Sequence, residues 1–170
     1  MRFYLLLLIA IWVAVPARAA TVDELVQQGE TALATKDIAS AMKAFDAALE
    51  ADPKNAKAAY NRGRINLVLH KNAAAVADFT TAILADPKMG IAYSARAEAK
   101  LNLKDEKSAF EDLDLGVKAS PNNSEVFILR ATYRMRIGDA LGAKADLLSA
   151  RLVANGETAK MLDALLLKMQ

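Results

Sequence analysis

Small and apolar residues recur along the chain with a period of 34 residues. Pro53, Pro87 and Pro121 are spaced by this interval, and each follows a stretch rich in alanine or leucine. Three further positions keep their character in all four periods: Ala41, Ala75, Ala109 and Ala143; Ala48, Ala82, Gly116 and Ala150; and Phe45, Phe79, Leu113 and Leu147. A fixed period of this length is typical of proteins that stack copies of one small structural unit.

Each period is predicted to contain two helices. No segment alternates apolar and polar residues with period two, and the abundant alanine and leucine favour helix. We number each repeat from 1 so that its proline stands at position 32, and expect helix A over about positions 1–14 and helix B over about 17–30. The proline ends helix B, because the residue before a proline is steered away from helical geometry.

The predicted fold is all-α, with four repeats over residues 21–157 and a capping helix at 158–170. The repeats are 22–55, 56–89, 90–123 and 124–157. Small residues also recur at position 8 of helix A, as Gly29, Gly63, Ala97 and Ala131. Antiparallel helices approach to about 8 Å only where such side chains meet. One helix pair buries too little surface to fold alone, so the repeats must stack.

The period, the two-helix unit, the small positions and the closing proline resemble the tetratricopeptide repeat family. The segments Ala59-Tyr60-Asn61-Arg62-Gly63 and Ala77-Asp78-Phe79-Thr80-Thr81-Ala82-Ile83 are especially similar to bacterial members. The resemblance covers about residues 22–157. It has two departures. Position 11, often large and apolar in the family, is polar here, as Asn66, Lys100 and Arg134, and Ala59 replaces the bulky residue expected at position 4.

The resemblance implies an α-solenoid in a right-handed superhelix, with A helices lining a concave groove that binds an extended peptide or protein segment. Positions 2, 5, 6, 9 and 13 of helix A usually point into that groove. From these positions we predict the following ligand-binding residues: Lys57, Tyr60, Asn61, Arg64, Ser94, Glu98, Asn102 and Arg136. Tyrosine and arginine are frequent interface anchors, and an amide can pair with peptide backbone. The alternative is an ordinary solvated helix face.

One subgroup of the family holds the C-terminal carboxylate of chaperone tails with lysine, asparagine and further basic residues of helix A. Here Val26, Glu30, Ser94 and Glu98 occupy four of those positions, and only Asn61 fits. We therefore do not expect a chaperone tail as the ligand.

Arginine at position 7 and aspartate at position 23 recur together in the last three repeats, as Arg62 and Asp78, Arg96 and Asp112, and Arg130 and Asp146. Repeat 1 lacks both partners, with Gln28 and Ala44 in their places. We therefore predict an ion pair, 16 residues apart in sequence, that joins helix A to helix B. The alternative is a role for these charges in ligand binding.

Residues 1–20 differ from the rest of the chain. A basic start is followed by an apolar run from Phe3 to Val15, then by a proline and small residues. This is the layout of a secretory signal peptide, and the run is shorter than the ~20 residues that span a bilayer. We expect cleavage near Ala19 or Ala20 and a periplasmic or secreted protein. The alternative is an uncleaved N-terminal membrane anchor. The only tryptophan, Trp12, lies in this segment.

Cleavage would leave a chain without net charge. Residues 1–20 hold two of the 22 basic residues and none of the 20 acidic ones, so the two signs balance at 20 each. Proteins that bind nucleic acid usually present a basic face, and none is indicated here, so we predict no nucleic-acid partner. Membrane contact is expected only through the signal segment, if it stays uncleaved.

The sequence offers no recognisable catalytic chemistry. Cysteine is absent, and the single histidine, His70, lies in a predicted turn where we expect it to be solvated. No nucleophile elbow, phosphate-binding glycine loop or metal-ligand spacing is present. We therefore predict an interaction protein that is not an enzyme and has no catalytic residues, metal or cofactor.

The tail from residue 158 has apolar residues at helical spacing: Met161, Leu162, Leu165, Leu166 and Met169. We expect it to cover the open end of repeat 4, although it could instead present apolar surface to a partner or to a second copy. Two functions therefore stay open. One is an exported module that binds a protein or peptide in its groove. The other is a structural subunit of an envelope complex, assembled through the repeat ends and the leucine-rich tail.

Overall fold

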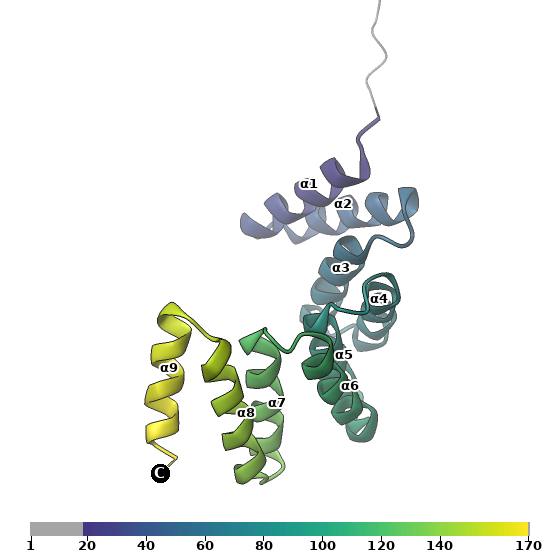
Figure 1. Cartoon of the computed structure of the whole chain (residues 1–170). Coiled ribbons are helices and arrows are strands. Elements are labelled where there is room, and N and C mark those ends of the chain that lie inside the picture. The colour runs from purple at the N-terminus through teal and green to yellow at the C-terminus, as the bar shows by residue number, and fades with distance from the viewer. Residues whose placement is uncertain (1–18, 170) are drawn as a thin grey trace, which may run out of the picture.

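The computed structural model describes residues 19–169, and within that range the chain forms nine α-helices and no strand (Figure 1). The helices are α1 (Val22–Ala34), α2 (Ile38–Ala51), α3 (Ala56–Val68), α4 (Asn72–Ala85), α5 (Gly90–Asn102), α6 (Glu106–Ala119), α7 (Ser124–Arg136), α8 (Ala140–Val153) and α9 (Gly156–Leu167). The prediction of an all-α repeat array is confirmed. The expected signal peptide lies almost wholly outside the described residues.

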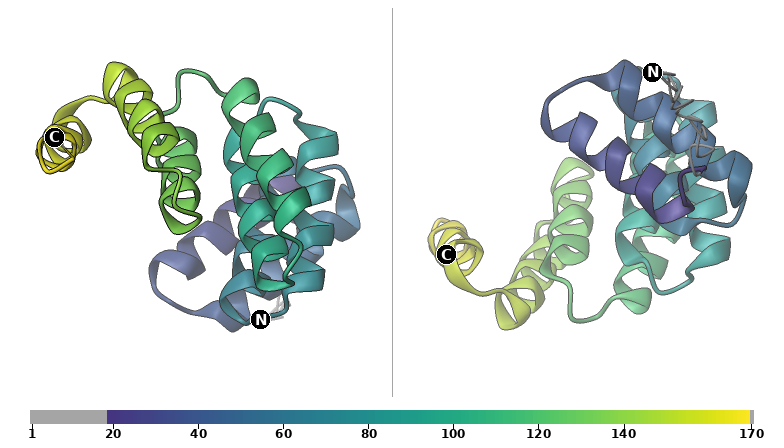
Figure 2. Two further views of the ribbon diagram at one scale, coloured as in Figure 1. Left: turned by 90° about the horizontal axis from the view of Figure 1, so that it is seen from below. Right: turned by 90° about the horizontal axis from the view of Figure 1, so that it is seen from above.

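The first eight helices form four hairpins that follow one another in chain order, and α9 lies beyond the last (Figures 1 and 2). The A helices α1, α3, α5 and α7 contact one another between repeats, whereas no two B helices do within residues 19–169. The array therefore bends with the A helices on its inner, concave side. None of the helices in the described range has the length and hydropathy needed to cross a membrane.

Local signals set where the helices begin and turn. A capping box begins α1, where the Thr21 hydroxyl accepts from the Glu24 N–H and the Glu24 carboxylate accepts from the Thr21 N–H. An aspartate caps α2, α6 and α8 in turn: Asp37, Asp105 and Asp139. The residue before each B-helix cap has left-handed backbone geometry, as Lys36, His70, Lys104 and Gly138. Only the last is a glycine, the residue best suited to that geometry.

The contact between helices A and B is tightest where glycine faces phenylalanine. A Cβ atom added to Gly29 would lie 2.5 Å from Cε1 of Phe45, and one added to Gly63 would lie 2.7 Å from Cε1 of Phe79. Repeats 3 and 4 place alanine and leucine at the same two positions, and all four of these residues are buried: Ala97, Leu113, Ala131 and Leu147. The larger ring therefore requires glycine opposite it, while leucine leaves room for alanine.

The arginine at position 7 holds the two helices together in each of the last three repeats. Its Nη2 lies 2.6 Å from the aspartate 16 residues later, in the pairs Arg62–Asp78, Arg96–Asp112 and Arg130–Asp146. In every pair Nε also donates to the same carboxylate, so the contact is bidentate. The three aspartates are at most 5 % exposed.

The polar residue at position 11 is a second donor to the same buried carboxylate. Asn66 Nδ2 and Lys100 Nζ each lie 2.8 Å from their aspartate, and Arg134 Nη1 lies 2.9 Å from Asp146. The departure from the family pattern is thereby explained. A buried carboxylate needs several hydrogen bonds, and position 11 supplies one from the next helical turn.

The same arginines also join neighbouring repeats. Nη1 of each donates to position 25 of the preceding B helix: Arg62 to Asp46, Arg96 to Thr80 and Arg130 to Asp114, at 2.9, 3.1 and 2.8 Å. One guanidinium therefore connects three helices, and we call this set of contacts the arginine ladder. The ladder joins the two helices of one repeat and also joins that repeat to the preceding one.

The last helix covers the end of repeat 4 through three of the five apolar residues of the predicted stripe. Leu162 is fully buried against the core of α7 and α8, with Leu166 and Met169 partly buried beside it. Met161 and Leu165, expected in the same contact, are 53 % and 41 % exposed. The orientation of α9 is set partly by contacts with α8, including an ion pair from Arg151 Nε to Asp163, at 2.6 Å.

Candidate functional site

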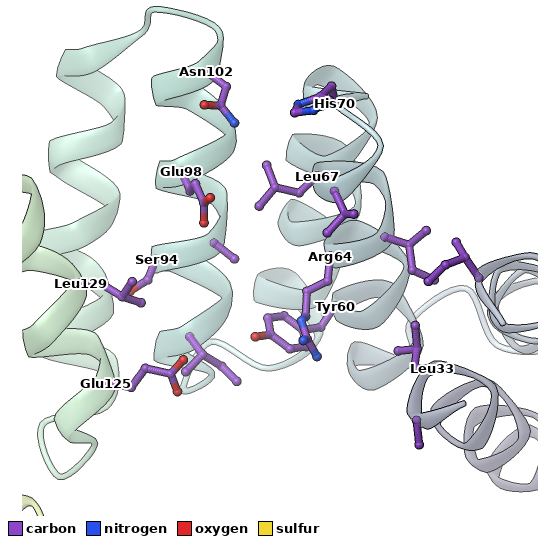
Figure 3. Close-up of a pocket in the computed structure, with 16 residues that line it drawn as sticks. Leu33, Tyr60, Arg64, Leu67, His70, Ser94, Glu98, Asn102, Glu125 and Leu129 are labelled. Atoms are coloured by element: carbon purple, nitrogen blue, oxygen red, sulfur yellow. The ribbon is translucent and has the colours of Figure 1, made fainter. Parts of the chain in front are cut away.

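A cavity of about 840 Å³ opens on the concave side, between α3 and α5 (Figure 3). Five helices and one turn contribute to its walls, which are formed by Leu33, Ala34, Ile38, Tyr60, Arg64, Ile65, Leu67, Val68, His70, Ile91, Ser94, Ala95, Glu98, Asn102, Glu125 and Leu129. We call this the concave cavity. Residues from all four repeats meet there, so it exists only in the stacked array.

Much of the cavity wall is apolar. Repeat 1 contributes Leu33 and Ile38, α3 contributes Val68, and Ile91 and Leu129 come from α5 and α7. Val68 is 72 % exposed although it is β-branched and apolar. Apolar surface that stays in water inside a hollow favours a ligand with apolar side chains, because covering that surface is energetically favourable.

Tyr60 and Arg64 form a preorganised pair on the α3 wall. The Tyr60 ring rests on the buried Phe79 ring, with centroids 5.9 Å apart, and Arg64 Cζ lies 5.8 Å from the Tyr60 centroid. Burial raises the pKa of the Tyr60 hydroxyl above its ordinary value; Arg64 opposes this rise and Glu125 adds to it. The hydroxyl therefore stays protonated at neutral pH and can donate or accept a hydrogen bond.

The opposite wall carries carboxylates. Glu98 of α5 and Glu125 of α7 both extend toward the cavity in Figure 3, facing the Tyr60–Arg64 pair. Neither glutamate, nor Arg64, forms an ion pair with any residue of the described range. These charges differ from those of the arginine ladder, which are paired inside the repeats. They are available to a ligand.

An amide and an imidazole lie at the end of the cavity near the helix turns. Asn102 Nδ2 donates to Asn72 Oδ1 at 3.2 Å, which ties the end of α5 to the start of α4. His70 lies across from Asn102 in Figure 3. Its left-handed backbone, φ 56°, is unusual for a residue other than glycine and places the side chain beside the cavity.

Five of the eight predicted groove residues line the concave cavity: Tyr60, Arg64, Ser94, Glu98 and Asn102. Among these, Ser94 is only 3 % exposed, so it offers little surface to a ligand. The other three predicted residues, Lys57, Asn61 and Arg136, lie elsewhere.

Each of these three residues has a local reason for its place. Asn61 is 8 % exposed and directs its amide at Glu30 of α1, 3.5 Å away, because position 6 of α3 faces the preceding A helix. Lys57 borders a smaller hollow between α1 and α3. Arg136 lies over the Tyr133 ring, with Cζ 5.2 Å from the centroid.

His70 is an exposed turn residue, as expected, but it also lines the cavity, which the sequence analysis did not predict. A signal was present, because His70 stands at the turn position that is glycine in repeat 4. The apolar contribution of Leu33 and Ile38 was not foreseen either. They flank the turn of repeat 1, and the bend of the array brings that turn to the cavity.

No group of three or more histidine, cysteine, aspartate or glutamate side chains within residues 19–169 has an arrangement suited to a metal ion.

Comparisons with known proteins agree with the repeat architecture. A model of the tetratricopeptide repeat family matches residues 25–55. The tetratricopeptide repeat domain of Sgt2 from Aspergillus fumigatus is 26 % identical, with a TM-score of 0.63 over 70 % of this chain and 80 % of that one. A comparison of the sequence with curated proteins gives no match.

Two further structures share the fold. The first tetratricopeptide repeat domain of Spaghetti (RPAP3), solved with the HSP90 peptide SRMEEVD, is 24 % identical, with a TM-score of 0.63 over 71 % of this chain and 93 % of that one. MamA of Desulfovibrio magneticus RS-1, from residue 41 to its end, is 19 % identical, with a TM-score of 0.65 over 78 % of this chain and 75 % of that one.

Proposed function

We propose that this chain is a tetratricopeptide repeat protein that serves as a protein-interaction module and holds an extended segment of a partner protein in the concave cavity. One observation carries the proposal. The cavity combines exposed apolar side chains with an arginine and two glutamates that have no ion-pair partner in the described range. A hollow that brings apolar side chains together with charges of both signs favours a protein ligand, which offers groups that match both.

The dimensions of the site suit an extended chain. The cavity crosses α3, α5 and α7, and neighbouring helices pack about 8–10 Å apart, so the crossing is about 20 Å long. An extended polypeptide covers this length with about six residues. The RPAP3 domain, which has the same fold, is an example of such a module with a bound peptide.

We also propose that the module works outside the cytoplasm, in the periplasm or after secretion. The support is the signal-peptide pattern of residues 1–20 and the absence of cysteine. Intact-mass measurement of the protein purified from the envelope tests this. A mass that lacks residues 1–19 or 1–20, with no tryptophan absorbance because Trp12 is lost, is expected. A full-length mass would instead support a membrane anchor.

A crosslinked pull-down from the envelope fraction tests the site. The cavity variant is Val68→Asp/Arg64→Glu, and the matched control is Leu84→Asp, because Leu84 is 78 % exposed on α4, outside the cavity. We expect wild type and the control to capture the same partner and the cavity variant to lose it. Equal helicity of all three proteins is the check on folding. Capture that survives in the cavity variant would contradict the proposal.

The alternative function, a structural assembly subunit, has a separate observation in its favour. The side of α8 that faces away from the core carries Leu141 and Leu152, 85 % and 86 % exposed, with Leu148 between them. A second copy of the chain could cover these leucines. However, the surface area of one helical stripe is small compared with the area that each partner buries in a stable interface, about 800 Å². Analytical ultracentrifugation of wild type and of Leu141→Asp/Leu152→Asp tests this. If copies assemble through these leucines, the particle mass of the variant is lower than that of wild type.

A further inference from the structure

The charges of the concave cavity are divided between its walls. Arg64 is the only arginine or lysine that lines it, and it lies on α3. The two carboxylates, Glu98 and Glu125, lie on α5 and α7, so the cavity holds one more negative than positive side chain. All three side chains are exposed, and the apolar residues Val68, Ile91 and Leu129 share the cavity with them.

We propose that the bound segment is basic and apolar, with an aliphatic or aromatic side chain in the cavity and an adjacent lysine or arginine that faces Glu98 and Glu125. This inference rests on the proposed function and names the ligand that this chain selects. The apolar side chain covers the exposed surface of Val68 and its neighbours. The ligand cation pairs with carboxylates that have no other ion-pair partner in the described range.

The same geometry excludes acidic segments. A ligand carboxylate on the α5–α7 wall would meet two like charges in a partly covered site, and like charges brought together at an interface weaken binding. Arg64, the one arginine or lysine among the described residues of the lining, lies on the other wall against the Tyr60 ring. The Arg64 guanidinium can instead donate hydrogen bonds to backbone carbonyl groups of the ligand, since it carries N–H donors and no acceptor.

The residues that would favour an acidic ligand are turned away from the cavity. Lys57 borders the separate hollow between α1 and α3, where Asp23 and Glu30 are its neighbours. Lys100 is paired with the buried Asp112 at 2.8 Å. Arg136 lies over Tyr133 outside the cavity. The basic side chains of these A helices are therefore used for structure or directed elsewhere, and the glutamates set the charge preference.

A peptide selection tests this inference. A phage-displayed library of random 12-residue peptides is selected in parallel on the wild-type protein, on Glu98→Gln/Glu125→Gln and on the control Glu106→Gln/Glu111→Gln. The control removes the same charge from exposed positions of α6 that do not line the cavity. Peptides from the wild-type selection are then synthesised and their affinities measured on all three proteins and on Val68→Asp.

We expect lysine or arginine beside apolar residues in the peptides enriched on wild type and on the control. Their affinity should fall about five- to tenfold on Glu98→Gln/Glu125→Gln, as two exposed ion pairs allow, and the difference should shrink at high salt. Acidic or charge-neutral peptides that lose binding to Val68→Asp would overturn the inference and leave the proposed function standing. Peptides that bind Val68→Asp as tightly as wild type would overturn the proposed function itself. So would a selection that enriches no peptide on any of the proteins.

Discussion

Repeats 1 and 3 have the same backbone and different interiors. In both, helices of 13 and 14 residues are joined by a left-handed lysine, Lys36 or Lys104, followed by an aspartate cap. In repeat 1 the interior is apolar, with Gly29 beneath the Phe45 ring. In repeat 3 a buried carboxylate receives an arginine and a lysine. The turn and the caps therefore define the unit, and its interior can be filled in two chemically different ways.

The difference also bears on where the chain matches the tetratricopeptide repeat family. The family model matches residues 25–55, which lie within repeat 1, the repeat without buried charges. Repeat 3 carries Arg96 and Lys100 at positions 7 and 11, and both side chains turn toward helix B. Glu98, on the other side of the same helix, is exposed to the cavity. The interior can thus change without altering the surface of the helix that lines the cavity.

The largest expected effect comes from breaking the ladder in repeat 3. Arg96→Ala leaves Asp112, 2 % exposed, with one cationic partner in place of two and also removes the contact with Thr80. We expect a loss of about 3 kcal/mol in the free energy of unfolding, as for other broken buried ion pairs. Denaturant unfolding measures it. Gln28→Ala, at the equivalent exposed position of repeat 1, should change stability little, and equal losses in the two variants would contradict the comparison.

A second prediction replaces the glycine–phenylalanine pair of repeat 1 with the alanine–leucine pair that repeat 3 has at the same two positions. Gly29→Ala places a methyl group against the Phe45 ring, and the overpacking should cost about 2 kcal/mol. Phe45→Leu in the same chain recreates the alanine–leucine pair of repeat 3 and should recover part of that loss. A double-mutant cycle by thermal unfolding measures the coupling. Strictly additive effects would show that the two positions do not depend on each other.

Substitutions in the turn that repeats 1 and 3 share should raise the stability of the protein slightly, whereas the preceding substitutions lower it. Lys36 and Lys104 have φ angles of 61° and 67°, where a side chain is strained and glycine is not. Lys36→Gly and Lys104→Gly should each stabilise the protein by about 0.5 kcal/mol, because relief of strain exceeds the entropy that glycine adds to the unfolded chain. The test is the midpoint of urea unfolding. A gain in one repeat only would mean that the two turns are not equivalent.

The smallest effect concerns pH and the aspartate caps. Hydrogen bonds from Ser40 lower the pKa of Asp37, and hydrogen bonds from Ser108 lower that of Asp105. These pKa values are lower in the folded state than in the unfolded chain. The caps therefore contribute fully to the free energy of unfolding above the ordinary aspartate pKa of about 3.9, and this contribution is lost as the pH falls through the pKa values of the folded protein. Asp37→Ala and Asp105→Ala should lower Tm similarly at pH 7, and their difference from wild type should narrow below pH 4. A constant difference down to pH 2 would contradict this.

Recurrence at one period made part of this architecture predictable from sequence. Arg96 and Asp112 have equivalents of the same type in repeats 2 and 4, so their spacing indicated a contact. The contact from Arg96 to the preceding repeat was not predictable, because position 25 is aspartate, threonine, aspartate and leucine in successive repeats. The donors Asn66, Lys100 and Arg134 also differ in type, so only their polarity recurs, and they could be recognised only as departures from the family.

The candidate site was less predictable than the fold, because it depends on how the repeats are rotated against one another. Tyr60, Arg64 and Glu98, chosen from the family positions, line the cavity. Asn61, chosen in the same way, is buried by the packing of α3 against α1. The family positions could not include Ile38 and His70, which lie outside the A helices and reach the cavity through the bend of the array.

Site-specific photocrosslinking in living cells tests the central claim, that partners bind in the concave cavity. A photoreactive amino acid is placed at Val68 in the cavity, at Leu84 on α4 or at Leu152 on α8, three positions that are all highly exposed. The account predicts a covalent adduct of defined mass with a partner protein from position 68 alone. Adducts from position 84 or 152, with none from position 68, would contradict it and place the interaction on the outer surface.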